Sequence, residues 1–249
     1  MIGQDEAASH WPLNSGTGLR KGVVDHAPTS LNTCNICGSQ EFSFGWRARG
    51  QAARPPQCVR CKTVERHRIV RSIYSCLRPV LRKWRAFQFA PDRSVEPSWF
   101  ATFESSVFHS TNSVDMMDTG FADGAFDLII SNHVLEHVAD DVRALRETLR
   151  VVGPAGIVHV CVPTPIYHWE TQDWGHPDPN LDFHYRLYGA DFPLQMCERI
   201  ADLHCIAAAG NDPVTATSDI VYFFSYLPSS LQLVGQQLQH FGVPVFRCT

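Results

Sequence analysis

The feature that most limits the fold is an alternation of apolar strand patterns with an amphipathic helix pattern. Residues 126–131 (FDLIIS) and 157–162 (IVHVCV) are β-branched apolar runs. Between them, residues 140–151 carry apolar side chains on one helical face and charged ones on the other, and the glycine-containing stretch 153–156 ends the helix. Strands that alternate with helices in this way predict a parallel sheet with helices on both faces.

Weaker patterns extend the same alternation in both directions. The expected additional strands and helices are strands at 86–90, 107–109, 205–209 and 220–226, and amphipathic helices at 191–203 and 231–241. The chain is therefore expected to contain one α/β domain over residues 86–249.

Two CxxC pairs precede this domain. Cys34 and Cys37 form the first pair, and Cys58 and Cys61 form the second. Each pair predicts a tight knuckle whose thiolates point at one ion, and two knuckles complete a tetrahedral four-sulfur site. Thiolates in this arrangement select Zn²⁺, and four protein ligands make the ion structural. An iron–sulfur centre and four unrelated cysteines are the alternatives.

The remaining N-terminal segments divide around the cysteine pairs. Residues 1–30 lack periodicity and read as a flexible arm, and residues 31–63 as a zinc ribbon. Residues 64–85 form a connecting helix with an apolar position every four residues, in which Pro79 predicts a kink or break. The arginine-rich stretch 47–85 reads as a solvated basic face or as a docking surface for an acidic or phosphate-bearing partner.

Charge and composition narrow the class of protein. The net charge of −4 does not indicate a nucleic-acid binder. The sequence has no apolar stretch of about 20 residues for a membrane span, and the N-terminus has no apolar signal-peptide core. Nine cysteines without export signals favour a reducing compartment, so a cytoplasmic location is expected.

The stretch from Asp115 to Val138 resembles one known family. Its sequence, DMMDTGFADGAFDLIISNHVLEHV, continues into Leu145, Glu147 and the segment 151–156, and is similar to the signature of class I S-adenosylmethionine (SAM)-dependent methyltransferases. The HYRLYGAD element at 184–191 is similar to one found in a bacterial subgroup with an N-terminal ribbon. The resemblance covers roughly residues 86–225 and implies a Rossmann-like fold that binds SAM.

The resemblance also implies positions for the cofactor. Asp115 matches the acid that accepts a hydrogen bond from the adenine amino group, although it could instead cap a turn, and Met116 follows it. Ligands of such sheets bind outside the carboxyl ends of the strands. The cofactor-binding residues expected there are Phe89, Ala90, Pro91, Asp92, Asp115, Met116, Asn132 and His133.

Two departures from the family pattern concern this cofactor. The loop after the first strand, residues 89–94 (FAPDRS), lacks the glycines that let a backbone approach the cofactor closely. The acidic residue that holds the ribose is missing from residues 107–112, where the second strand is expected to end.

Candidate catalytic residues lie near the expected acceptor. His184, in the polar and aromatic segment 167–188, and His133 are the expected proton acceptors, because an imidazole titrates near neutral pH. Arg186 could clamp an acceptor carboxylate or phosphate, or form a structural pair with His184. His133, Glu136 and His137 also match an HxxEH zinc-peptidase pattern, which the methyltransferase signature explains without a metal.

Three functions follow from these residues. The first is SAM-dependent methylation of a small-molecule or glycan acceptor, expected at oxygen. The second is a methyltransferase-fold protein with a degenerate SAM site, which acts as a non-methylating enzyme or as a binding or assembly partner. The third is an RNA methyltransferase that docks through the ribbon and the arginine-rich stretch. A protein partner or a homodimer is compatible with each of them.

Overall fold

The computed structural model describes residues 33–44, 55–163 and 167–248. The arm expected at residues 1–30 lies outside the described residues. None of the described helices combines the length and the apolar character that crossing a bilayer requires.

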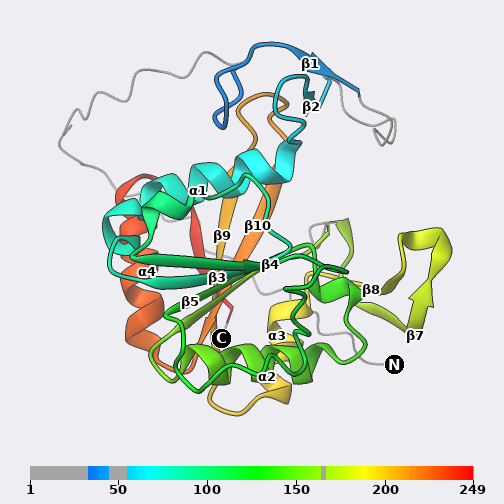
Figure 1. The fold of residues 1–249 in the computed structure, drawn as a ribbon, viewed down its shortest axis with the longest axis vertical. Coiled ribbons are helices and arrows are strands. Elements are labelled where there is room, and N and C mark those ends of the chain that lie inside the picture. Colours follow the sequence, from blue (N-terminus) through cyan, green and yellow to red (C-terminus); the bar gives the residue numbers. More distant parts are fainter. Residues whose placement is uncertain (1–32, 45–54, 164–166, 249) are drawn as a thin grey trace, which may run out of the picture.

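A seven-stranded sheet forms the centre of the molecule (Figure 1). Its strand order is β11-β9-β10-β6-β5-β3-β4. The strands are β3 (Arg85–Phe89), β4 (Thr102–Ser106), β5 (Leu128–Asn132), β6 (Ile157–Cys161), β9 (His204–Asn211), β10 (Ser218–Ser225) and β11 (Val245–Arg247).

The sheet is mixed, whereas the sequence predicted a parallel one. Strands β4, β3, β5 and β6 are parallel, as expected. Strand β10 is antiparallel to both of its neighbours, β6 and β9, because a short turn joins β9 to β10 as a hairpin. Consequently β10 begins at the edge where the parallel strands end.

The second strand of the sheet lies earlier than predicted. The strand expected at 107–109 is wrong, since β4 occupies Thr102–Ser106 and pairs with β3 over its whole length. Residues 107–113 instead form turns, in which Ser110 N donates to Val107 O at 3.2 Å. Phe108 lies in this turn and is 75% exposed, so its apolar side chain does not pack in the sheet as a strand residue would.

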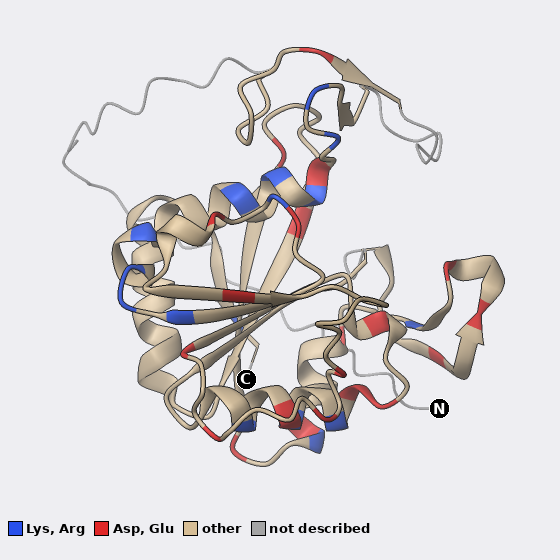
Figure 2. Ribbon diagram, viewed as in Figure 1, with Lys and Arg blue, Asp and Glu red and all other residues tan. Residues whose placement is uncertain are grey.

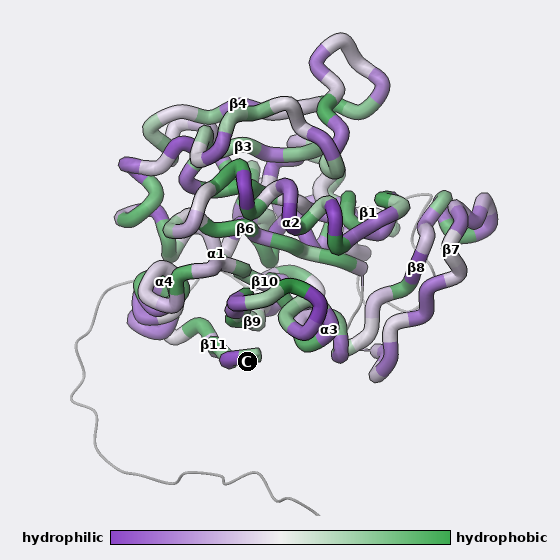
Figure 3. Tube along the Cα trace, turned by 90° about the horizontal axis from the view of Figure 1, so that it is seen from below, coloured by the Kyte–Doolittle hydropathy of each residue, from purple (hydrophilic) through white to green (hydrophobic). Residues whose placement is uncertain are grey.

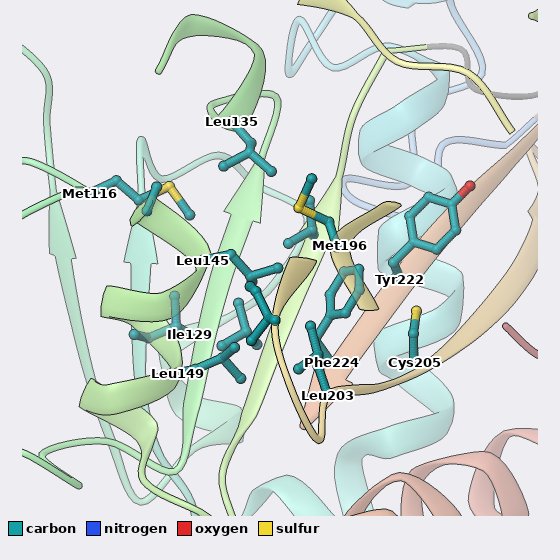
Figure 4. Close-up of a cluster of buried hydrophobic side chains, with 14 of the residues drawn as sticks. Met116, Ile129, Leu135, Leu145, Leu149, Met196, Leu203, Cys205, Tyr222 and Phe224 are labelled. Atoms are coloured by element: carbon teal, nitrogen blue, oxygen red, sulfur yellow. The ribbon is translucent and has the colours of Figure 1, made fainter. Parts of the chain in front are cut away.

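Helices cover both faces of the sheet, as the alternation predicted. Helices α1 (Glu65–Leu81) and α4 (Pro228–His240) pack on one face, and α2 (Asp141–Val152) and α3 (Phe192–Arg199) pack on the other. Figure 4 shows the core beneath α2 and α3, where Leu145, Leu149 and Met196 belong to the same buried cluster as Ile129 of β5.

Two helices end differently from their sequence patterns. Helix α1 continues through Pro79 and ends at Leu81, so the proline lies in the last turn, where the helix stops anyway. Helix α3 ends at Arg199, short of the predicted Leu203, and Asp202 in the following turn has a positive φ of 58°.

Two smaller units flank the sheet. A hairpin of β7 (Gln172–Asp178) and β8 (His184–Leu187) projects from the body and is largely hydrophilic (Figure 3). The short strands β1 (Phe42–Ser43) and β2 (Gln57–Cys58) belong to the cysteine-containing unit, which lies at the N-terminal end of α1 (Figure 1). Short 3-10 helices η1 (Pro97–Trp99), η2 (Leu135–His137) and η4 (Pro179–Leu181) complete the described fold.

Basic residues recur along α1 (Figure 2), and they are divided between surface and interior. Arg68 and Arg71 are buried. Arg71 pairs with Glu96 and lies over the Trp99 ring at 4.4 Å, and Arg78 lies over the same ring. Part of the arginine-rich segment therefore serves packing.

Candidate functional site

The candidate site lies at the edge of the sheet where β3, β5 and β6 end and β10 begins. His133 follows β5, Cys161 ends β6, and Asp219 lies near the start of β10. One ligand-type atom from each of these residues lies within 4.8 Å of the others. The Asp219 carboxyl and the His133 imidazole therefore lie close together. Burial raises the pKa of the Asp219 carboxyl, which shows that this place is partly desolvated.

A chain of hydrogen bonds runs from helix α1 over strands β6 and β5 to the loop after β3, next to this edge. Tyr74 Oη of α1 lies 2.9 Å from His159 Nδ1, and His159 Nε2 lies 2.8 Å from Asn132 Oδ1. Asn132 Nδ2 in turn donates to Asp92 Oδ2 at 3.2 Å and to Ser94 Oγ at 3.1 Å. The chain therefore ties helix α1, strands β5 and β6 and the loop after β3 into one unit.

The direction of these hydrogen bonds is set by the amide of Asn132. Because its Nδ2 donates to Asp92 and Ser94, its Oδ1 must accept from His159 Nε2, and His159 Nδ1 then accepts from Tyr74. Desolvation lowers the pKa of His159 to about 3 and raises that of Tyr74 well above its usual value. Both groups are therefore neutral near neutral pH.

The loop after β3 is shaped without glycine. Ala90 adopts a positive φ of 45°, the left-handed region in which glycine is usual, and donates its N–H to Ser106 O at 2.9 Å. Asp92 then accepts from Ser94 N at 2.8 Å and from the Ser94 hydroxyl. Ala90 and Pro91 are exposed at the edge, whereas Phe89 is buried.

The other residues expected at the cofactor differ in their accessibility. Asp115 is exposed, and its Oδ1 accepts from Met117 N at 2.8 Å, which is the turn-capping role. Met116 is 3% exposed and packs in the core, with its sulfur 4.0 Å from Ser131 Oγ. Asn132 belongs to the buried chain of hydrogen bonds.

A second cluster adjoins His133. Glu136 and His137 lie in η2, and His184 begins β8, so the cluster joins the turn after β5 to the projecting hairpin. His133 Nδ1 lies 3.4 Å from Glu136 Oε1. The rings of His137 and His184 meet edge-to-face with centroids 4.6 Å apart. Desolvation lowers the pKa of His184.

Glu136 is the most unusual member of this cluster. Its side chain is 1% exposed, and neither carboxylate oxygen has a hydrogen-bond partner among the described residues. His133 Nε2 is likewise buried without such a partner. Buried polar groups are almost always paired, so these atoms are available to contact a bound ligand or ion.

Arg186 holds the backbone of this cluster in place. Its guanidinium donates to Val138 O at 2.6 Å and to Ala139 O at 2.8 Å, and its Nε donates to Asp173 Oδ2 at 2.7 Å. The side chain is 2% exposed. In this structure the donors of Arg186 therefore serve the turn that carries Glu136 and His137.

The rest of the HYRLYGAD element anchors the hairpin. Tyr188 Oη donates to Asp141 Oδ2 at 3.0 Å, and Asp191 accepts from Thr171 N at 2.9 Å. A Cβ on Gly189 would lie 2.5 Å from the backbone carbon of Glu170, so only glycine permits this close approach. These contacts fix His184 opposite η2.

The four cysteines of the CxxC pairs form one cluster, in which Cys34, Cys58 and Cys61 are buried and Cys37 is partly buried. Sγ atoms of Cys34 and Cys61 are 3.7 Å apart, and those of Cys37 and Cys58 are 3.5 Å apart. A tetrahedral site with bonds of about 2.3 Å has sulfur–sulfur edges of about 3.8 Å. Each pair also closes an equivalent turn, with Gly38 N donating to Cys34 O at 2.8 Å and Lys62 N donating to Cys58 O at 2.9 Å.

A hollow of about 310 Å³ lies elsewhere, between α4, β9 and β11. Its lining includes Gln232, Gln236 and Gln239 of α4, Arg247 of β11 and the first residues of β9. Those residues lie at the opposite edge of the sheet from His133, so the hollow is separate from both clusters.

Sequence reasoning missed part of this site. Asp219 was missed because a parallel β10 would have begun at the opposite edge of the sheet. Tyr74 and His159 lie within apolar patterns and gave no signal of their own. Glu136 was noticed only as part of the HxxEH pattern, and its burial is visible only in three dimensions.

Comparison with known proteins gives one family match. Residues 97–160 match a family described as "Methyltransferase domain", and this segment contains β4, β5, η2, α2 and most of β6. No curated protein matches the chain.

Several solved structures are similar to part of the chain. A SAM-dependent methyltransferase from Thermotoga maritima is 10% identical, with 65% of this chain and 91% of that chain covered and a TM-score of 0.42. The 1,6-didemethyltoxoflavin-N1-methyltransferase from Burkholderia thailandensis, solved with S-adenosylhomocysteine, is 12% identical over 64% of this chain and 78% of that one, with a TM-score of 0.44. A methyltransferase from Haloferax volcanii, in complex with the activator Trm112, is 13% identical over 63% and 88%, with a TM-score of 0.40.

Proposed function

We propose, on the premise that residues 97–160 belong to the methyltransferase-domain family, that this protein transfers a methyl group from SAM to an oxygen atom of a small-molecule or glycan acceptor. The observation that carries the proposal is the position of His133. It directly follows β5, at the carboxyl edge of the parallel strands, and it lies inside the matched segment. Ligands of open α/β sheets bind at this edge.

The cofactor would lie along the loop after β3. Ala90 and Pro91 present exposed backbone there, and the left-handed conformation of Ala90 provides the sharp turn that glycine usually provides. Asp92 and Asn132, held by the chain of hydrogen bonds, form the floor, and exposed Asp115 is the acceptor proposed for the adenine amino group. Phe89 and Met116 would support this surface from the core. SAM, when bound, supplies an electrophilic methyl group.

Proton removal from the acceptor is assigned to the histidines. His133 Nε2 has no partner among the described residues, and Glu136 lies at its other ring nitrogen, so the ring is oriented and one nitrogen is available to take a proton. His184 adjoins the same cluster and is the second proposed base. Arg186 acts as a positioning residue through the η2 turn in this proposal, rather than as an acceptor clamp.

Two further assignments accompany this function. The four-cysteine cluster is proposed to bind a structural Zn²⁺, because its sulfur–sulfur distances fit a tetrahedral site of this size. All nine cysteines are unpaired, which supports the proposed cytoplasmic location.

Isothermal titration with SAM and with S-adenosylhomocysteine tests cofactor binding. We expect both to bind the full chain, and we expect Asp92→Asn to weaken binding roughly tenfold, because losing one charge-assisted contact costs about 1.5 kcal/mol. Asp202→Asn is the matched control, since Asp202 is exposed and lies at the opposite edge of the sheet. Binding of neither compound to the folded wild-type chain would refute the proposal.

A methyltransferase-fold protein that transfers no methyl group is the second candidate. It is favoured by one observation, since Asp92 and Asp115 already accept hydrogen bonds from protein donors. The same titration separates the two candidates. An RNA acceptor predicts instead a salt-sensitive affinity for RNA. Burial of Arg68 and Arg71 leaves fewer basic groups on α1 for such a partner.

A further inference from the structure

We propose that Glu136, His137 and His184 form a second metal site, separate from the four-cysteine cluster, which takes a divalent transition-metal ion such as Zn²⁺. One ligand atom from each residue lies within 4.8 Å of the others. Two imidazoles and one carboxylate are a ligand set that zinc and other borderline transition ions accept, whereas Mg²⁺ and Ca²⁺ require mainly oxygen ligands.

The buried carboxylate is the independent observation in favour of an ion. Glu136 is 1% exposed, and both oxygens lack hydrogen-bond partners among the described residues. A buried, ionised carboxylate without compensation is expensive. His133 Nδ1 lies 3.4 Å from Glu136 Oε1, and Oε2 has no hydrogen-bond partner among the described residues, so Oε2 is the oxygen that would face a cation.

The geometry requires only a small adjustment. Bonds of about 2.1 Å place tetrahedral ligands about 3.4 Å apart, so side-chain rotation on the order of 1 Å brings the three atoms into range. His137 is exposed, which gives an ion access from solvent. The rings of His137 and His184 already meet edge-to-face, with centroids 4.6 Å apart.

The surroundings of the three residues are rigid, as a metal site requires. Arg186 fixes the η2 turn by donating to Val138 O and Ala139 O. Trp174 Nε1 donates to His184 O at 2.9 Å, which fixes the backbone of His184. Supporting hydrogen bonds of this kind orient the ligands of known metal sites.

Three protein ligands leave a coordination position open, as in catalytic zinc sites. An oxygen atom of the acceptor is the ligand that we expect there. That last assignment rests on the proposed function, in which His133 then remains as the proton acceptor. The presence of the ion does not rest on it.

Metal content of the purified full chain tests the site. After removal of loosely bound metal and reloading with Zn²⁺, elemental analysis should find two zinc ions per wild-type chain. Glu136→Gln and the double variant His137→Ala/His184→Ala should retain one, in the four-cysteine cluster. His168→Ala is the matched control, because His168 is an exposed histidine just before the same hairpin, and it should retain two.

Substitution with Co²⁺ identifies which site is lost. The cysteine cluster gives thiolate-to-cobalt charge-transfer absorption, whereas a site of nitrogen and oxygen ligands does not. We expect the double variant to keep the charge-transfer absorption and lose only weak ligand-field bands. One ion in the wild type with full thiolate absorption, or two ions in the double variant, would overturn the proposal. Neither readout depends on SAM binding or methyl transfer.

Discussion

At the scale of single residues, the site depends on groups that are kept neutral. Tyr74, His159 and Asn132 pass one set of hydrogen bonds across the sheet to Asp92. The interior tolerates this chain because each described donor along it finds an acceptor and His159 carries no charge. The sequence could identify Asn132 and Asp92 from their positions after strands, but it could not show that they are joined, because the joining residue is a histidine inside an apolar strand.

His159 should make stability depend on pH. Its pKa is about 3 in the folded protein and about 6.5 when unfolded, so between these values the unfolded state binds the extra proton. Stability should therefore fall as pH decreases through this window, by up to about 1.4 kcal/mol per pH unit from this residue.

His159→Gln tests this dependence, since glutamine can still accept from Tyr74 and donate to Asn132. The free energy of unfolding of both proteins is measured by urea denaturation at several values between about pH 7 and about pH 5. It should decrease less steeply with falling pH in the variant than in the wild type. His67, whose pKa is lowered to about 4 mainly by desolvation, contributes in the same direction to both proteins and cancels in the comparison. Equal slopes would show that the pKa of His159 does not differ between the folded and unfolded states, which would contradict its burial as a neutral group.

At the scale of elements, the sequence predicted the four helices and most strands of the central sheet within a few residues, but not β11 or the hairpin of β7 and β8. The buried strands β5 and β6 and helix α2 were evident because their apolar patterns are strong. The edge strand β4 was misplaced, because only Ser106 of its five residues is buried, which weakens its apolar pattern, and the apolar Phe108 lies beyond its end and is exposed. The antiparallel direction of β10 followed from the hairpin with β9, which periodicity does not reveal.

The hairpin of β7 and β8 should be sensitive to one methyl group. Gly189→Ala places a Cβ against the backbone of Glu170, so the hairpin must move and His184 with it. We expect a loss of about 1–3 kcal/mol in the free energy of unfolding. Gly235→Ala in α4 is the control, because its Cβ meets only ordinary contacts, at 3.7 Å, and alanine favours a helix. A stability loss in the control equal to that of Gly189→Ala would contradict this account.

At the scale of the whole molecule, an ion pair joins the start of helix α1, next to the cysteine-containing unit, to the turn between β9 and β10. Arg68 contacts Asp212 through two hydrogen bonds, of 2.6 and 2.8 Å, and both side chains are fully buried. Arg68 also donates to Pro56 O and Thr63 O, and Asn35 donates to Arg68 O. The sequence predicted that a zinc ribbon, a connecting helix and an α/β domain follow one another along the chain. It did not predict that Arg68 contacts residues of all three.

Removing one partner of this pair should be costly. Asp212→Asn leaves the Arg68 guanidinium buried without its counter-charge, and we expect a loss of about 3 kcal/mol or more in the free energy of unfolding. Chemical denaturation of the zinc-loaded protein measures it. Asp202→Asn, at an exposed position, should change stability by no more than about 0.5 kcal/mol. A loss for Asp212→Asn no larger than that would mean that the pair does not hold the two regions together.

The Arg68–Asp212 contact can form only late in translation. A ribosome makes Arg68 early, and 144 residues separate it from the aspartate that neutralises it. Until the turn between β9 and β10 has emerged, the growing chain keeps a cation that has no place to be buried. Prematurely terminated products that stop before this turn should therefore lack the contact that holds the cysteine-containing unit against the start of helix α1. Proteases should cleave that region in such products but not in the full-length protein.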